Sequence, residues 1–325
     1  MAYTTIDNPE LYFQTVLYGG NNSTQSITLG GDEDMQPDLV WIKARSDAGE
    51  HTVYDSVRGA TKRLDTADNG AEDTVTNGVT AFNSDGFSLG AGGNENSATT
   101  IVAWCWKESA TAGFDIVSYT GNSTNRTIAH SLSAVPHMMI VKTRSDANEW
   151  GVYHQSIGNT KFLNMNKNDA IGDDAGYWND TTPTSSVFTV GTGGTTNANT
   201  ITTIAYLFAP IQGYSKFGSY KGNADNDGAF VYVGFRPAFV LLKNSTGGNG
   251  WEMRDNKRPG YNYNTGTLAP SSSDAETTGE GIDIFSNGFK LRASGNGQNG
   301  DNTYMYMAFA EAPFVNSNGV PCNAR

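Results

Sequence analysis

Residues 37–43 read Pro-Asp-Leu-Val-Trp-Ile-Lys, and the pattern returns as Pro-His-Met-Met-Ile-Val-Lys at 136–142 and as Pro-Ala-Phe-Val-Leu-Leu-Lys at 237–243. In each stretch a lysine follows the proline by six residues, after a run that is almost wholly apolar. Short apolar runs rich in β-branched and aromatic residues are typical of buried β-strands. A strand that occurs three times indicates an internal repeat, which decides how the whole chain is divided.

Further features recur around these strands in the same order. An aromatic-glycine pair precedes each strand, and a phenylalanine strand and an apolar strand around an alanine follow it, mostly at intervals of 101 residues. The pairs are Tyr18 with Gly20, Tyr119 with Gly121 and Tyr220 with Gly222; the phenylalanines are Phe87, Phe188 and Phe289; the alanines are Ala103, Ala205 and Ala308. The repetition predicts β-sandwich modules over 14–112, 113–213 and 214–313, with an N-terminal arm over 1–13 and a C-terminal tail over 314–325.

Each predicted module has about 100 residues, enough to hold a core of its own. Clusters of Asn, Gly, Asp and Ser separate its short strands, and no apolar pattern of helical period continues for three turns. We therefore expect an all-β fold of three tandem antiparallel β-sandwiches, of jelly-roll or lectin-like type. The equal spacing also suggests that the modules pack around a pseudo-threefold axis.

The composition limits the functions to consider. There are 21 Lys and Arg against 33 Asp and Glu, a net charge of -12. This charge repels phosphate backbones and anionic membranes, so we expect neither nucleic-acid binding nor membrane insertion. No apolar run approaches the length of a membrane span and the first ten residues lack a signal-peptide pattern, so we expect a soluble chain without an export signal. Cys105 and Cys322 do not indicate a disulfide framework.

Motifs that carry catalysis are not found in the sequence. The four histidines show no metal-ligand spacing, and no nucleotide-binding or nucleophile-elbow glycine motif occurs. Acidic clusters at 32–34 and 173–174 could supply the two carboxylates of a glycoside hydrolase, but neither cluster recurs in the other modules. We therefore expect no enzyme, no catalytic residues and no cofactor.

One segment resembles half of a calcium-binding loop. Residues 223–228 read Asn-Ala-Asp-Asn-Asp-Gly, with oxygen-bearing side chains at positions one, three and five and glycine at six. The twelfth position is Gly234 rather than the glutamate that completes an EF-hand. Asp225 and Asp227 are therefore candidates for a weak Ca²⁺ site only, and a tight turn is the alternative.

Aromatic residues in polar surroundings are the candidate ligand contacts, because a flat ring can stack on the apolar face of a sugar. Tyr177 and Trp178 lie among Asp and Asn residues, and Tyr261 and Tyr263 lie in a Pro-Gly-Tyr-Asn-Tyr-Asn segment. The alternative is that these four side chains cover an edge of a sandwich or an interface between modules.

A polar, glycine-rich loop precedes the closing strand of each module and changes in length, over 90–96, 191–199 and 294–302. A loop that varies on a constant scaffold is a common place for binding specificity. We expect these loops to supply recognition, and drift in a solvated turn is the alternative.

Four segments of the first module and one at each end carry a family resemblance. They read Pro-Asp-Leu-Val-Trp-Ile-Lys-Ala-Arg-Ser at 37–46, Tyr-Asp-Ser-Val-Arg-Gly-Ala-Thr-Lys at 54–62, Ser-Asp-Gly-Phe-Ser-Leu-Gly at 84–90, Val-Ala-Trp-Cys-Trp-Lys at 102–107, Met-Ala-Tyr-Thr-Thr-Ile-Asp at 1–7 and Ala-Glu-Ala-Pro-Phe-Val-Asn-Ser-Asn-Gly-Val-Pro at 310–321. They resemble a module of virion structural proteins of marine tailed phages. The other two modules match more loosely and lack the Asp-Ser-Val-Arg-Gly-Ala segment. The resemblance implies a phage particle component with no catalytic or cofactor residues to assign.

Two functions follow from this resemblance. In the first, the chain is a tail-fibre or adhesin component on the virion surface, which recognises host surface glycan through its variable loops as a homotrimer. In the second, it is a decoration protein of the capsid or tail, with purely architectural contacts to other virion proteins. A polysaccharide-degrading enzyme is the more distant alternative.

Overall fold

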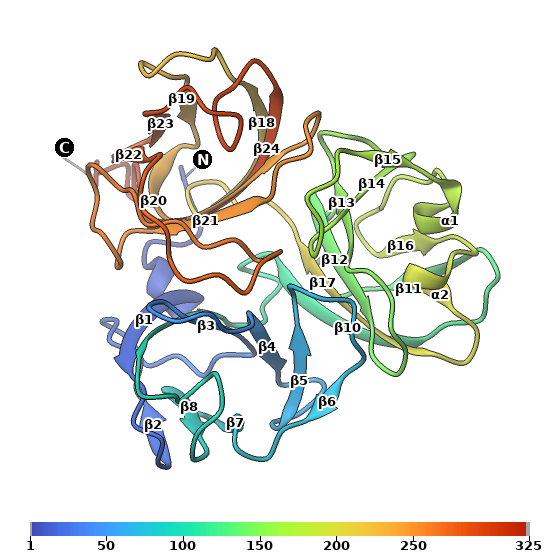
Figure 1. Ribbon diagram of the computed structural model, residues 1–325. Helices are drawn as coiled ribbons and strands as arrows, with labels where there is room; N and C mark the ends of the chain where they lie inside the picture. The colour runs from blue at the N-terminus through green and yellow to red at the C-terminus, as the bar shows by residue number, and fades with distance from the viewer. Residues whose placement is uncertain (1, 323–325) are drawn as a thin grey trace.

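The computed structural model describes residues 2–322, which form antiparallel sheets with three short helical turns (Figure 1). The predicted all-β class is confirmed. The strands fall into three consecutive sets, each with one larger and one smaller sheet, and we call these sets modules one, two and three. The residue boundaries that the repeat suggested stay a prediction. Within residues 2–322, every helix is too short to cross a lipid bilayer.

Module one has a larger sheet in the order β1-β9-β3-β4-β5-β6 and a smaller sheet in the order β2-β8-β7. A single 3-10 turn, Pro9–Leu11, precedes it, and the Asn8 side chain caps this turn by accepting a hydrogen bond from the Glu10 amide. The strands are β1 (Phe13–Gly19), β2 (Gln25–Ile27), β3 (Leu39–Ala44), β4 (Thr52–Asp55), β5 (Lys62–Asp65), β6 (Asp73–Thr74), β7 (Val79–Asn83), β8 (Gly86–Leu89) and β9 (Thr100–Trp106).

Module two repeats this order, with a larger sheet β10-β17-β12-β13-β14-β15 and a smaller sheet β11-β16. Two single-turn helices, α1 (Ala175–Trp178) and α2 (Gly194–Asn197), flank β16 in the chain. The strands are β10 (Phe114–Thr120), β11 (Arg126–Ala129), β12 (Met138–Thr143), β13 (Gly151–His154), β14 (Lys161–Asn164), β15 (Gly172–Asp173), β16 (Val187–Val190) and β17 (Thr202–Phe208).

Module three keeps the first four positions of the larger sheet, β18-β24-β20-β21, and has a smaller sheet in the order β19-β23-β22. The strands are β18 (Ser215–Lys221), β19 (Phe230–Tyr232), β20 (Phe235–Asn244), β21 (Trp251–Asp255), β22 (Ile282–Phe285), β23 (Gly288–Leu291) and β24 (Thr303–Pro313).

The proline-to-lysine strand is apolar along its whole length because it lies between two cores. In module one, Val40 and Ile42 belong to the core between the two sheets, whereas Leu39 and Trp41 belong to a core that all three modules share. Side chains alternate along a strand, so a strand covered on both faces shows continuous rather than alternating hydrophobicity. The equivalent stretch of β12 divides between two cores in the same way, and that of β20 is buried on both faces by the shared core.

The lysine at the end of each of these strands is also buried, and its ammonium group donates to backbone carbonyls. In modules two and three one acceptor belongs to the preceding module: Lys142 Nζ donates to the Asn69 carbonyl at 3.3 Å, and Lys243 Nζ donates to the Asn168 carbonyl at 3.1 Å. Burial lowers the pKa of Lys43, Lys142 and Lys243 to about 8. Two of the three repeated lysines therefore help to join neighbouring modules.

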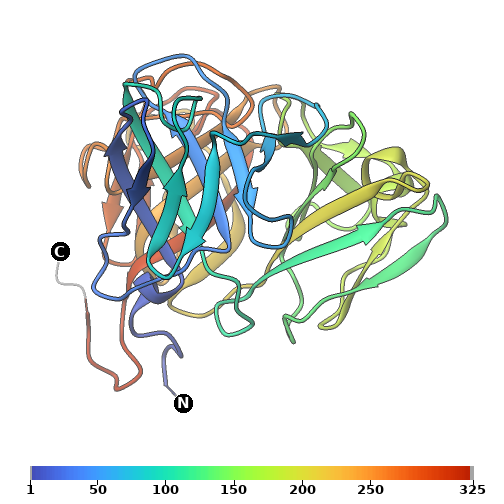
Figure 2. The same cartoon turned by 90° about the horizontal axis from the view of Figure 1, so that it is seen from below.

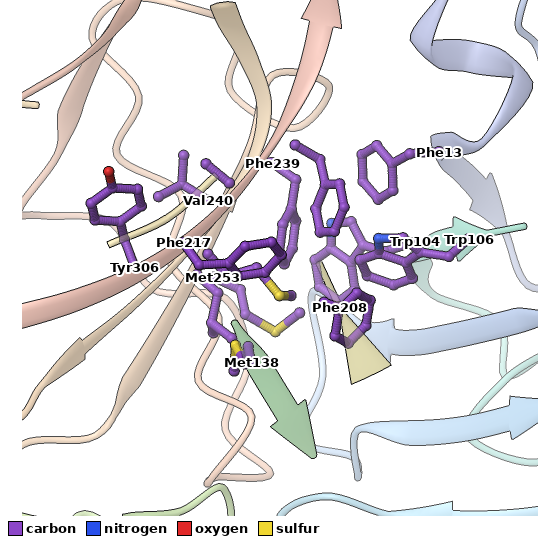
Figure 3. Close-up of a cluster of buried hydrophobic side chains, with 14 of the residues drawn as sticks. Phe13, Trp104, Trp106, Met138, Phe208, Phe217, Phe239, Val240, Met253 and Tyr306 are labelled. Carbon is purple, nitrogen blue, oxygen red and sulfur yellow. The ribbon is translucent and has the colours of Figure 1, made fainter. Parts of the chain in front are cut away.

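The three modules surround one core rather than following each other in a line (Figure 1). Trp106, Phe208 and Phe309 occupy equivalent places in the closing strands, and the ring centroid of Phe309 lies 5.8 Å from that of Trp106 and 6.0 Å from that of Phe208. Figure 3 shows Trp106 and Phe208 beside Phe217 and Phe239 of module three. A cavity of only ≈ 10 Å³ is found in this core, so its centre is filled by side chains.

Each module extends one loop onto the next, and three equivalent backbone hydrogen bonds close a ring. Module one contacts module two, module two contacts module three, and module three contacts module one. The bonds run from the Glu72 amide to the Arg144 carbonyl at 2.7 Å, from the Ile171 amide to the Ser245 carbonyl at 3.0 Å, and from the Glu276 amide to the Arg45 carbonyl at 2.7 Å.

Ion pairs reinforce two of these three seams. Glu72 pairs with Arg144 of the next module at 2.8 Å and with Arg58 of its own module at 3.2 Å. The seam from module three to module one has the same arrangement, centred on Glu276. In the seam from module two to module three, Ile171 takes the place of the glutamate and packs against the central core. The same backbone hydrogen bond is thus supported by ion pairs in two seams and by an apolar contact in the third.

The aromatic-glycine pair that starts each repeat lies at the end of the first strand and, with a buried asparagine, holds the loop before the closing strand. We call this tyrosine, glycine and asparagine the clasp. In module one, Tyr18 Oη donates to the Glu95 carbonyl at 2.8 Å, and the buried Asn96 side chain donates to two further carbonyls. Gly20 packs so closely that a Cβ would lie 1.7 Å from the Ser97 carbonyl oxygen, so only glycine fits there. The same contacts are made by Tyr119, Gly121 and Asn197 and by Tyr220, Gly222 and Asn299.

The strand register corrects one equivalence drawn from the sequence. Ala103 and Ala205 pair with the residue before the lysine of the proline-to-lysine strand, and in module three Tyr306, not Ala308, takes this place. The loop before the closing strand is therefore one residue longer in modules two and three than in module one. If Ala308 were counted instead of Tyr306, the distance from Phe289 would be two residues longer.

Candidate functional site

Two of the four predicted ligand-contact aromatics are buried. Tyr177 and Trp178 end helix α1 and belong to the core between the sheets of module two. The Tyr177 ring stacks on Phe162 with centroids 3.8 Å apart, and Trp178 Nε1 donates to the Lys161 carbonyl at 3.1 Å. The expectation that this pair faces solvent is wrong, because the polar neighbours, including the capping Asp174, mark the ends of a one-turn helix whose aromatic residues turn inward.

The other two predicted aromatics differ in exposure. Tyr261 is half-buried, its hydroxyl donates to Glu311 Oε1 at 2.6 Å, and the Arg236 guanidinium lies 5.4 Å from its ring centroid. Tyr263 is 45% exposed, and its hydroxyl donates to the backbone carbonyl of Arg292 at 3.2 Å. Of the four candidates, only Tyr263 presents a ring that a ligand could reach.

The predicted calcium ligands do not come together as a site. Asp225 and Asp227 are exposed, and Asp227 pairs with Lys290 at 3.0 Å and with Arg292 at 3.3 Å. The hydrogen bond from Lys290 and its positive charge lower the pKa of the Asp227 carboxyl. Within residues 2–322, no cluster of three or more His, Cys, Asp or Glu side chains is arranged to hold a metal ion.

The loops predicted to vary are held by the clasp. Within each, an asparagine that is fully buried fixes the loop backbone, and the residue before it accepts the tyrosine hydroxyl. These asparagines are Asn96, Asn197 and Asn299. The three loops therefore have the same internal hydrogen bonds. A ligand could distinguish them only by their outward-facing residues.

The outer face of module three carries an aromatic pair that the sequence analysis did not single out. Phe230 and Tyr232 on β19 are 47% and 50% exposed. The strand register places them where β2 has Ser26 and the following Thr28, and where β11 has Thr127 and Ala129. These outward positions are small in modules one and two and aromatic only in module three.

A surface hollow of ≈ 400 Å³ lies beside Tyr232, between module three and the N-terminal arm. Tyr3, Gln212 and Lys216 line it together with Tyr232, and the Tyr3 hydroxyl donates to the Gly234 carbonyl at 2.7 Å. Lys216 Nζ lies 5.2 Å from the Tyr232 ring centroid and donates to the Tyr232 carbonyl at 2.8 Å. Burial lowers the pKa of Lys216 and raises that of Tyr3.

The hollow and the adjoining β19 face form what we call the β19 surface. It combines flat rings with an exposed amide on Gln212 and an ammonium group on Lys216. Rings stack on the apolar face of a sugar while amide and ammonium groups donate hydrogen bonds to its hydroxyls. Comparison of the same strand position in the three repeats would have found Phe230 and Tyr232, because the equivalent residues are Ser26 and Thr28 in module one and Thr127 and Ala129 in module two.

The fold and this surface define a class of protein: an all-β ring of packed sandwiches with an exposed aromatic pair on one module. A family model described as "Domain of unknown function (DUF7483)" matches residues 8–313. The chain therefore belongs to the DUF7483 family. No curated protein matches the chain.

Proposed function

We propose that the chain is a non-enzymatic structural protein of a bacteriophage virion, a tail-fibre or adhesin component that contacts host surface glycan. The observation that carries the proposal is the exposure of Phe230 and Tyr232 at positions that are small in the other two modules. Exposed apolar groups gathered beside a hollow are typical of a binding surface. The virion assignment is supported by the resemblance of module one to phage structural proteins.

The contact is proposed for the β19 surface, with the loops before the closing strands in a secondary role. The clasps constrain these loops in all three modules, whereas the β19 surface exists on module three alone. A single ring of three similar modules would then present one glycan contact per chain. Assembly as a homotrimer on the virion surface belongs to the same proposal and would bring three such contacts together.

Glycan binding by the purified chain tests the proposal. We expect binding to host surface polysaccharide that falls about tenfold in the double variant Phe230→Ser, Tyr232→Ala, because two stacking contacts of about 0.5–1.5 kcal/mol each are lost. Tyr263→Ala is the matched control, since Tyr263 is similarly exposed but lies outside the hollow. No binding by the wild-type chain, or equal binding by the double variant, would reject the adhesion role.

The second candidate function is decoration of the capsid or tail, and one observation favours it. Among the described strands, β19 is an edge strand that pairs with β23 alone, and it carries Phe230 and Tyr232; the Tyr232 carbonyl accepts a hydrogen bond from Lys216. Such an edge also suits contact with another protein chain. Rebinding of the purified chain to stripped virions, lost in the same double variant while glycan binding is absent from the wild type, would favour decoration over adhesion.

A further inference from the structure

The seam between modules three and one contains a hollow of ≈ 290 Å³ that is separate from the β19 surface. Strand β1 forms one wall, with Phe13, Thr15 and Leu17, and module three forms the opposite wall, with Ala238 and Asn256. Its volume is at the lower end of the range for small-molecule sites, about 300–1,000 Å³.

Two buried polar side chains in this hollow lack partners. Thr15 and Asn256 are each 8% exposed, and Thr15 Oγ1 and Asn256 Oδ1 have no hydrogen-bond partner within the described part of the chain. A buried polar atom without a partner costs roughly 1–3 kcal/mol, so native structures nearly always satisfy such atoms with protein, water or ligand. Both atoms come from residues that line the same hollow, one from each module.

The equivalent seams show that the hollow is particular to this place. Thr15 pairs with Trp104, and the register puts Ile116 and Phe217 in the matching positions of modules two and three. Ile116 and Phe217 belong to the central core, whereas Thr15 brings a hydroxyl oxygen that has no hydrogen-bond partner within residues 2–322. Two of the three equivalent positions thus have large apolar side chains, and the third has a small polar one.

Asn256 also has equivalents in the other modules. The backbone amide of Asn256 donates to the Ala238 carbonyl. In the same way, the backbone amides of Ser56 and Gln155 donate to the carbonyl of the residue after the proline in their own modules. Gln155 Nε2 meets the Phe217 carbonyl at 3.5 Å, so its side chain is engaged across its seam. In the seam from module three to module one, Thr15 and Asn256 line a hollow, and the Asn256 side-chain oxygen has no partner across the seam within residues 2–322.

The charges at the rim indicate the kind of ligand. Glu311 is paired with Arg236 at 3.0 Å, and the charge of Glu10 is balanced by that of the exposed Lys257, so the rim has no excess charge and a neutral molecule is favoured. Asn256 Oδ1 and the carboxylates accept hydrogen bonds and Thr15 Oγ1 both donates and accepts, a set that hydroxyl groups satisfy. The apolar wall of Phe13, Ala238 and Ala310 suits the carbon face of a ring.

We infer that this hollow binds a single small, neutral, polyhydroxylated molecule of monosaccharide size. The inference does not rest on the proposed function, because it concerns a different surface and requires no adhesion. Ligand hydroxyls supply the partners that Thr15 Oγ1 and Asn256 Oδ1 lack, and binding bridges modules three and one.

Titration of the full chain with D-glucose, D-galactose and D-mannose, followed by saturation-transfer NMR, tests the inference. We expect saturable binding of at least one hexose, weakened at least tenfold by Thr15→Ile, which places in module one the residue that module two has as Ile116. Thr15→Ser keeps the hydroxyl and should retain binding.

Two controls separate the possible outcomes. Thr15→Ile should unfold at a temperature equal to or above that of the wild type, which shows that lost binding is not lost folding. The Phe230→Ser, Tyr232→Ala variant should keep hexose binding, so failure of the β19 surface and failure of this hollow are distinguishable. No saturable binding of any of the three hexoses, or binding unchanged in Thr15→Ile, would show that the hollow holds water only and would overturn the inference.

Discussion

A buried ion pair recurs at the end of the strand that follows the proline-to-lysine strand. Asp55 with Arg58 and Asp255 with Arg258 form ion pairs whose side chains have no exposed surface. Asp255 Oδ2 also accepts a hydrogen bond from Trp104 Nε1 of module one at 3.0 Å. In sequence, the Asp-Ser-Val-Arg-Gly-Ala segment occurs in module one only. The structure shows the same ion pair in module three, because the aspartate and the arginine are three residues apart in both modules.

Asp255→Asn should lower the free energy of unfolding by about 3 kcal/mol, because the Arg258 charge stays buried when its carboxylate is removed. Urea unfolding followed by tryptophan fluorescence measures the loss. Asp227→Asn is the control: Asp227 is exposed, and its removal should cost less than about 1 kcal/mol. Module two has His154 and Ile157 at the two positions, so the double variant Asp255→His, Arg258→Ile should recover part of the loss. Equal losses for Asp255→Asn and Asp227→Asn would contradict the prediction.

His154 makes module two sensitive to acid. Its ring is buried, Nε2 lies 3.2 Å from the Tyr306 carbonyl, and burial lowers the pKa of the imidazole to about 4. The unfolded chain binds this proton near pH 6.5. The unfolded state therefore binds more protons between these values, so the contribution of His154 to stability is complete above pH 6.5 and is lost as the pH falls to about 4.

His154→Gln should reduce this acid sensitivity, because glutamine can donate to the Tyr306 carbonyl without titrating. Between pH 7 and pH 4.5 the wild type should lose about 2 kcal/mol more unfolding free energy than the variant. A His154→Gln profile parallel to that of the wild type would show that other groups cause the acid sensitivity.

At the scale of elements, the clasp holds the loop before each closing strand. In module two, Asn197 Nδ2 donates to the carbonyls of Thr124 at 2.8 Å and Gly191 at 2.7 Å, and Asn197 Oδ1 accepts from the Asn122 amide at 3.0 Å. One side chain thus satisfies three backbone groups that the loop would otherwise leave unpaired.

Asn197→Ala should cost about 2–3 kcal/mol of unfolding free energy and should speed hydrogen exchange of the loop over 191–200. Asn199→Ala, at an exposed position in the same loop, should change neither quantity. Exchange mass spectrometry on the two variants makes the comparison directly. Unchanged exchange in Asn197→Ala would mean that the loop is held by other contacts.

The sequence predicted those features that depend on local geometry. A strand covered on both faces must be apolar throughout, and a close backbone approach requires glycine, so β3 and Gly20 could be identified by comparing repeats. Exposure could not be predicted in this way, because it depends on how an element is turned in the fold. Trp178 has polar neighbours in sequence but faces the core, whereas Tyr232 lies in an apolar run but faces solvent.

At the scale of the whole molecule, a shared core joins the three modules into one cooperative unit. We expect a single calorimetric transition whose enthalpy equals the van't Hoff enthalpy, because no module can lose its inner face without exposing those of the other two. Two or three separate transitions would show that the modules unfold independently.

An isolated module one, residues 1–112, should self-associate in solution. Trp41, Trp104 and Trp106 would lie on an uncovered sheet face, since the partners that cover them belong to the other modules. Size-exclusion chromatography of this fragment against the full chain measures the effect. A monomeric, cooperatively folded fragment would contradict the shared-core account.

The closed ring also sets an order of events during synthesis. The seam from module one to module two joins Glu72 to Arg144, 72 residues apart, but the closing seam joins Arg45 to Glu276, 231 residues apart. The two ends of the described chain lie on the same side of the molecule (Figure 2). The Ser317 amide donates to Asp7 Oδ1 at 2.7 Å. The ribosome synthesises module one first and module three last. The Trp104 and Trp106 side chains therefore lack their module-three partners until almost the entire chain has emerged. Translation speed across module three therefore governs how long the nascent chain is exposed to aggregation.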